Sequence, residues 1–254
     1  MISSVVNRAG WYLSLYPSAG EGGGCFRASV PRRESSEYVA KGSAANPERA
    51  AEEAGRRARG RLRRYCSSNR LNRLGTLTYA GEGCHDVEQV RLDVGDFFRN
   101  LRTGLGGNPL PYAWVPEWHK THGLHLHFAV GRFVPRGLID EAWGRGFVHI
   151  KLLGNMGHGA TSLDEARRAA GYLSKYVAKT FTETDARLLG LHRYDLAQGF
   201  QPAKVSLYAR SRDGLIDLAS QTLESPPSKV WTSDETPGWQ GALAVWAQWP
   251  VSRG

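Results

Sequence analysis

A strand hairpin in the middle of the chain sets the strongest limit on its fold. Along residues 124–131, Leu, Leu, Phe and Val alternate with His, His and Ala before a closing Gly. Side chains alternate between the two faces of a strand, so one face is apolar and the other carries His125 and His127. A largely apolar run at 111–117 precedes this segment, joined by a short polar stretch that ends in Gly123. The pattern predicts two paired strands whose apolar side chains enter a core.

Strands and helices interleave on both sides of this hairpin. Runs rich in β-branched and aromatic residues indicate strands, and apolar residues spaced three or four apart indicate helices. Asn46 can cap a helix that begins with Pro47. Further strands are predicted at 11–16, 25–30, 73–79 and 146–153, and further helices at 87–101 and 137–143. The predicted fold class is α+β, with a central, mostly antiparallel sheet of about five strands flanked by helices.

Changes in composition divide the chain into three parts. Residues 1–45 carry two short strands around a glycine-rich, flexible segment, and residues 46–182 carry the regular pattern of strands and helices. Beyond residue 182 the periodicity weakens, and a Pro-Pro pair and several tryptophans follow. We therefore expect 183–254 to be an extension packed on the core.

The hairpin can also hold a metal ion. If its turn centres near Thr121, Glu117 lies directly opposite His125, and such residues share a face with Cβ atoms about 4.5–5.5 Å apart. Two imidazoles and one carboxylate then converge, a ligand set that suits Mn²⁺, Mg²⁺, Zn²⁺ or Fe²⁺. A His-x-His pair alone is equally compatible with a structural role, so the position of Glu117 carries the prediction. His122 lies in the turn and is interpreted as a loop or DNA-contacting residue.

A later helix presents two tyrosines and two lysines on one stripe. Ser162 and Glu165 have the spacing of a capping box at its start. Tyr172, Lys175, Tyr176 and Lys179 follow at helical spacing, and an apolar stripe lies about a quarter turn away. The phenols are potential nucleophiles, and an ammonium beside a phenol favours the phenolate. The structural alternative is that both tyrosines are half-buried at the edge of the helix.

The chain is strongly basic, with 33 Lys and Arg against 24 Asp and Glu and a formal net charge of +9. This balance points to nucleic acid or an acidic membrane as a partner. The helix that begins at Pro47 carries several of the arginines, which makes it a candidate arm for a phosphate backbone. A GC-rich genome or a solvated helix face explains the same arginines without a partner.

Several classes of protein are disfavoured. No apolar run approaches the ~18 residues that span a bilayer, and the N-terminus lacks the pattern of a secretory signal. The three cysteines fit neither a disulfide framework nor a Cys-x-x-Cys zinc site, and no phosphate-binding loop of an NTP-driven motor is present. These features predict a protein of the reducing cytoplasm.

Three motifs in a fixed order carry a resemblance to a known family. They are Thr76-Leu-Thr-Tyr79, then Glu117 with His125-Leu-His127, then Tyr172-x-x-Lys-Tyr176-x-x-Lys179. The order and spacing resemble those of HUH rolling-circle replication initiators. The chain is most similar to two-tyrosine initiators of the bacteriophage gene A type and to related plasmid and filamentous-phage replication proteins. The resemblance covers about residues 47–181.

The resemblance implies an HUH endonuclease fold with a ferredoxin-like palm. It implies that Glu117, His125 and His127 bind Mg²⁺ or Mn²⁺, which polarises the scissile phosphate as a Lewis acid. Tyr172, Tyr176 or both would attack the phosphorus, with Tyr176 preferred if only one acts. Lys175 and Lys179 are interpreted as catalytic residues that position phosphate. The predicted DNA-contacting residues are Arg56, Arg57, Arg59, Arg63, Arg64, Arg73, Thr78, Tyr79 and His122.

The implied function is a site-specific single-stranded DNA nickase and strand transferase that starts rolling-circle replication of a plasmid or phage in a bacterial cytoplasm. Its partners would be origin DNA and the host helicase and DNA polymerase, with no membrane. The first alternative is a two-tyrosine HUH transposase, although this chain lacks the cysteine zinc ribbon usual there. The second is a non-catalytic single-strand binder that uses Tyr79, Trp114 and Trp118 as stacking aromatics.

Overall fold

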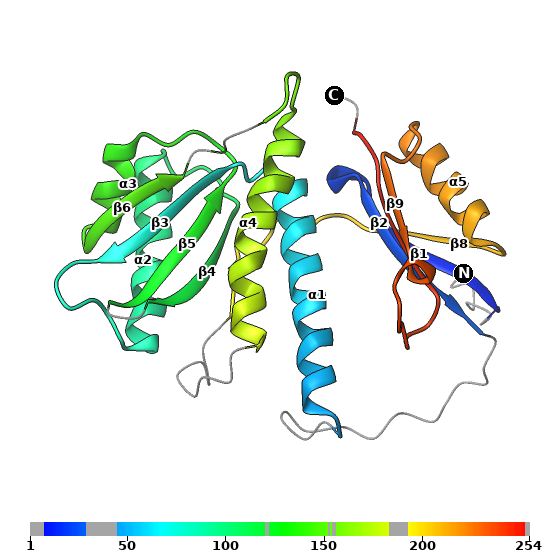
Figure 1. Cartoon of the computed structure of the whole chain (residues 1–254). Helices are drawn as coiled ribbons and strands as arrows, with labels where there is room; N and C mark the ends of the chain where they lie inside the picture. The colour runs from blue at the N-terminus through cyan, green and yellow to red at the C-terminus, as the bar shows by residue number, and fades with distance from the viewer. Residues whose placement is uncertain are drawn as a thin grey trace, which may run out of the picture. The chain divides into compact units, whose positions relative to one another are not determined.

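The computed structural model describes residues 8–28, 45–119, 122–151, 153, 156–182 and 193–251, with only the backbone at 180–182 (Figure 1). The chain forms two compact units. One is the continuous segment Ala45–Gln201, and the other combines Met1–Ala44 with Pro202–Gly254.

The unit Ala45–Gln201 is built on a five-stranded sheet with the order β6-β3-β5-β4-β7. Its strands are β3 (Arg73–Tyr79), β4 (Tyr112–His119), β5 (Gly123–Val130), β6 (Gly146–Lys151) and β7 (Asp195–Leu196). Neighbouring strands pair antiparallel, and the hairpin of β4 and β5 sets Glu117 opposite His125, as the sequence predicts. The predicted α+β class with an antiparallel sheet is confirmed.

Helices cover both faces of this sheet. They are α1 (Pro47–Ser68), α2 (Val87–Gly104), α3 (Arg136–Trp143) and α4 (Ser162–Thr182). One apolar core joins α2 and α3 to side chains such as Leu126 and Phe128 of β5. A second core joins α1 and α4 to the opposite face, where Val115 and Ala129 lie. Figure 1 shows α2 and α3 behind the sheet and the long pair α1 and α4 beside it.

The helix starts follow local capping chemistry. The side chain of Asn46 accepts a hydrogen bond from the backbone of Arg49, which confirms the predicted cap of α1. The predicted capping box of α4 is displaced by one residue. Thr161 and Asp164 form the reciprocal hydrogen bonds, while Glu165 instead accepts from Asn72. The shift moves the helix start by one position and leaves the predicted Tyr/Lys stripe unchanged.

The second unit contains a separate five-stranded antiparallel sheet with the order β8-β1-β2-β10-β9. Its elements are β1 (Gly10–Tyr16), β2 (Glu21–Arg27), β8 (Val205–Ala209), α5 (Arg212–Leu223), β9 (Lys229–Thr232) and β10 (Ala244–Gln248), with 3-10 helices at Pro17–Ala19 and Ser233–Glu235. Its core includes Trp11, Leu15, Leu215 and Trp249. Strands from the two ends of the chain therefore share one sheet, a pairing that the sequence does not predict.

None of the helices within the described ranges has the length and apolar run that a bilayer crossing requires.

Candidate active site

Helix α4 places both predicted tyrosines against strand β5. The ring of Tyr176 stacks on the ring of His127, with centroids 3.7 Å apart and planes inclined by 18°. Tyr172 meets the same imidazole edge-on at 6.1 Å, and the Tyr176 hydroxyl donates to the Tyr172 hydroxyl at 2.7 Å. The stripe that holds α4 in this orientation is buried at Ala166, Ala170, Leu173 and Val177. The fold thus brings together two segments that lie 45 residues apart in the chain.

A chain of polar contacts crosses the site from β3 to α4. The Thr76 hydroxyl lies 2.9 Å from Nδ1 of His127, and Nε2 of His127 lies 2.8 Å from Oε2 of Glu117. The other carboxylate oxygen of Glu117 accepts from Nζ of Lys179 at 2.8 Å. Because an ionised carboxylate only accepts, Nε2 carries the proton and Nδ1 accepts from Thr76. The hydrogen bond from Thr76 therefore sets the tautomer and ring orientation of His127.

The third predicted metal ligand is oriented differently. The ring of His125 stacks on that of His119, with centroids 4.7 Å apart and planes inclined by 3°, and its Nε2 is buried without a hydrogen-bond partner. As the side chains lie, no group of three His, Cys, Asp or Glu residues in the described part of the chain converges on an ion. Glu117 and His127 are already together, and His125 has a spare nitrogen. The donor chemistry fits a divalent cation, although the three groups do not converge.

The face that carries these histidines is not open. We expect from the sequence that both imidazoles lie exposed, but His127 is only 5% exposed because α4 covers it. Burial lowers the pKa of His127, and the hydrogen bond from Glu117 does not reverse this. For Glu117, burial raises the pKa, but the hydrogen bonds with Lys179 and His127 outweigh it and the net pKa is lowered. The pair is therefore a carboxylate and a neutral imidazole at neutral pH.

The tyrosines do not form a ready phenolate here. Burial, the hydrogen bond with Tyr172 and the charge of Glu117 raise the pKa of Tyr176 above its ordinary value. The expectation that a neighbouring ammonium favours the phenolate is wrong for this arrangement. Lys179 lies 5.5 Å from the ring centroid of Tyr176 but forms its ion pair with Glu117.

Two residues at the site are absent from the predicted set of site residues. Nζ of Lys151, at the end of β6, lies 4.7 Å from the centroid of the Tyr172 ring. Thr76 belongs to the first motif, but its contact with His127 depends on the pairing of β3 with β5. The pairing of β3 with β6 likewise decides the position of Lys151. Lys175, which the sequence places on the same stripe as the tyrosines, is exposed.

The predicted DNA-contacting residues are distributed over several surfaces. The side chain of Thr78 is half-buried on the same sheet face as Thr76, while Arg73 is exposed at the start of β3. Helix α1 carries its arginines around a buried stripe, with Arg56 and Arg57 exposed and Arg59, Arg63 and Arg64 half-buried. His122 lies in the hairpin loop, with its ring 5.9 Å from that of His119.

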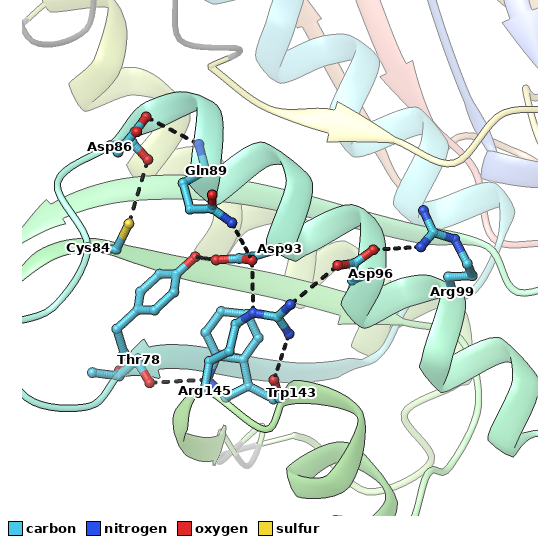
Figure 2. A network of polar contacts seen from close by, with 10 residues as sticks. Thr78, Cys84, Asp86, Gln89, Asp93, Asp96, Arg99, Trp143 and Arg145 are labelled. Carbon is cyan, nitrogen blue, oxygen red and sulfur yellow. Dashed lines mark hydrogen bonds and ion pairs between the residues drawn. The ribbon is translucent and has the colours of Figure 1, made fainter.

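Tyr79 is not on this surface. Its ring is 8% exposed, it belongs to the core under α2, and its hydroxyl donates to Asp93 at 2.8 Å. The interpretation of Tyr79 as a DNA contact is therefore wrong. Figure 2 shows the buried polar network around Asp93, in which Gln89 and Arg145 also bind the carboxylate. This network ties α2 to the segment before β6, on the sheet face opposite His127.

The segment that contains this site was compared with known protein families. Residues 72–181 match a family model of replication-associated proteins, the ORF2 family. The match runs from β3 to α4 and includes Thr76, Glu117, His127 and both tyrosines. No curated protein and no solved structure matches the chain. The match to this replication-associated family supports a role in the initiation of DNA replication.

Proposed function

We propose that this protein cuts single-stranded DNA at a replication origin and becomes covalently attached to it through a tyrosine, which initiates rolling-circle replication of a plasmid or phage. The observation that carries the proposal is the contact of Tyr176 and Tyr172 with His127. It sets two potential nucleophiles beside the residues that suit a phosphate-polarising cation.

The chemistry of the cut follows from these groups. The tyrosine oxygen attacks the phosphorus, a P–O bond to tyrosine forms, and the bond from phosphorus to the 3′ oxygen breaks. The phenol loses its proton, and the leaving oxygen takes up a proton to become a free 3′-hydroxyl that can prime synthesis. The products are a 5′-phosphotyrosine and a primer end, and the reverse reaction rejoins strands.

Glu117, His127 and His125 are the residues that would hold Mg²⁺ or Mn²⁺. The ion, when bound, supplies Lewis acidity that withdraws charge from the scissile phosphate. Thr76 orients His127 for this role, because second-shell partners fix the tautomer of a ligating imidazole. Lys179 neutralises Glu117 and lies next to Tyr176, so it is placed to contact phosphate once the carboxylate has another partner.

Two tyrosines on one helix face suit a mechanism in which strands are transferred from one hydroxyl to the other. Their oxygens are 2.7 Å apart, so both can reach one phosphate with little movement of α4. Origin DNA is the proposed substrate, and a host helicase and polymerase would supply unwinding and synthesis. A non-catalytic single-strand binder is less well supported because two of its stacking aromatics, Tyr79 and Trp114, are buried.

A covalent adduct assay tests the proposal. Labelled single-stranded oligonucleotides that tile the DNA around the coding sequence are incubated with the full chain and Mn²⁺, and SDS-stable adducts are separated by electrophoresis. We expect an adduct that EDTA or the double change His125→Ala and His127→Ala abolishes. Changing both Tyr172 and Tyr176 to Phe should also abolish it.

Single Tyr→Phe variants then show whether one or both tyrosines act. Tyr194→Phe, which alters a half-buried tyrosine outside the site, is the matched control and should retain the adduct. An adduct that survives the loss of both Tyr172 and Tyr176 would overturn the mechanism. Joining of two strands in place of nicking, on ends of a mobile element, would favour the transposase alternative.

A further inference from the structure

Strand β6 exposes one of its faces beside the tyrosines. Val148 and Ile150 point into the core under α2 and α3, so the alternating residues Phe147, His149 and Lys151 project from the opposite face. All three are exposed, and Phe147 is exposed to 68%, which is unusual for a phenylalanine in a sheet.

The neighbouring strand extends this surface. Thr78 lies opposite Phe147 and Thr76 lies opposite His149, so these side chains share a face across the strands. We call Phe147, His149 and Lys151 with the two threonines the β6 strip. It belongs to the sheet face that carries His127, since Thr76 is also opposite His127 in β5.

The β6 strip ends at the candidate active site. Nζ of Lys151 lies 4.7 Å from the centroid of the Tyr172 ring, and Lys151 is close enough to His127 to lower the pKa of that imidazole. From Phe147 to Lys151 the strand runs about 13 Å, at about 3.3 Å per residue. This length accommodates a few nucleotides that lead to or from a phosphate at Tyr172.

The chemistry of the strip selects its occupant. Neither β3 nor β6 contains an acidic residue, so no carboxylate of these strands repels a phosphate backbone. Lys151 supplies a cation at one end, the threonine hydroxyls and His149 supply hydrogen-bonding groups, and Phe147 supplies an exposed ring face. An exposed aromatic ring beside cations is the combination that binds single-stranded nucleic acid by base stacking and phosphate contact.

We propose that the β6 strip is a binding track for the single-stranded DNA that flanks the scissile phosphate, with a base stacked on Phe147 and a phosphate held by Lys151. This inference rests on the proposed function for the position of the scissile phosphate, but the binding itself does not require any cleavage.

Binding without chemistry tests the track. The full chain with Tyr172→Phe and Tyr176→Phe is titrated against a fluorescein-labelled oligodeoxythymidylate in EDTA, and the dissociation constant is measured by anisotropy. We expect Phe147→Ala to weaken binding about tenfold, within the range measured for loss of one stacked base. Phe147→Trp should retain binding because it restores the ring face.

Phe133→Ala is the matched control, because Phe133 is 73% exposed but lies outside the strip. Lys151→Gln should reduce the slope of log K against log salt concentration by about 0.7, the value for one phosphate contact on single strands. Equal affinities of the Phe147→Ala and Phe133→Ala variants would overturn the proposal.

The design separates this inference from the proposed function. Weaker binding by Phe147→Ala without any covalent adduct from the unmodified chain would support the track and reject the nuclease. An adduct together with unchanged binding by Phe147→Ala would reject the track alone. Because β6 is an edge strand, sedimentation is measured as well, and a dimer lost on Phe147→Ala with unchanged DNA affinity would assign the strip to a second copy of the chain and overturn the proposal.

Discussion

Replacing Arg145 by methionine should destabilise the unit Ala45–Gln201 by more than any surface arginine does. Nε of Arg145 lies 2.8 Å from Oδ1 of Asp93, whose side chain is only 6% exposed. Breaking a buried ion pair on one side costs about 3–5 kcal/mol, because the remaining charge has no compensation. Two features reduce this cost. Arg145 is itself 33% exposed, and Tyr79 and Gln89 still donate to Asp93.

We therefore expect a loss of about 2–3 kcal/mol in the free energy of unfolding for Arg145→Met. At about 2–4 °C per kcal/mol for a unit of this size, the melting temperature should fall by about 5–10 °C. Urea denaturation followed by circular dichroism measures the free energy, and hydrogen exchange in α2 assigns the loss to this unit. A double-mutant cycle with Asp93→Asn should give a coupling energy of about 1–2 kcal/mol.

Arg136→Met is the matched control. Arg136 pairs with Asp140, but both side chains are well exposed, so the pair should contribute less than about 0.5 kcal/mol. If Arg145→Met costs no more than Arg136→Met, the assignment of a buried, charge-compensating role to Arg145 is refuted.

Three further outcomes are expected. In EDTA the chain should lose stability as the pH falls below about 6.5, because His127 and Glu117 both have a lowered pKa in the fold, so the unfolded chain binds protons first, and His127→Gln should flatten this dependence in thermal melts. Gly75→Ala should cost about 1–3 kcal/mol in urea denaturation, since its Cβ would overlap the ring of Phe128, and Phe128→Leu should recover part of the loss. Arg59→Gln should lower the salt dependence of single-strand binding by about 0.7 in log–log slope if α1 contacts phosphates, and an unchanged slope would remove Arg59 from the interface.

Much of the candidate site could be predicted because its determinants are local. Alternation along 124–131 decides which face carries His125 and His127, and the short loop sets Glu117 opposite His125. The stripe of Tyr172 and Tyr176 follows from helical spacing alone. These patterns hold wherever the two segments end up, so only their meeting needed the structure.

Other features depend on pairings between distant segments, which leave no local signal. Tyr79 lies in a strand covered on both faces, where alternation does not tell which core a side chain enters. The stacking of His125 on His119 requires the actual geometry of the hairpin. The shared sheet of the two chain ends joins β1 to β8 across about 190 residues, and no periodicity within either segment indicates its partner.

That shared sheet has a consequence for synthesis of the protein on the ribosome. Strands β1 and β2 emerge early, but their sheet partners β8 and β10 are translated about 180–220 residues later. At about 5–20 residues per second, the first hairpin waits roughly 10–45 s before β10 can pair with it. During this interval the continuous segment that carries the tyrosines has all the residues needed to fold on its own. The nascent chain therefore assembles its middle before its ends, with two unpaired strand edges in contact with chaperones until translation is nearly finished.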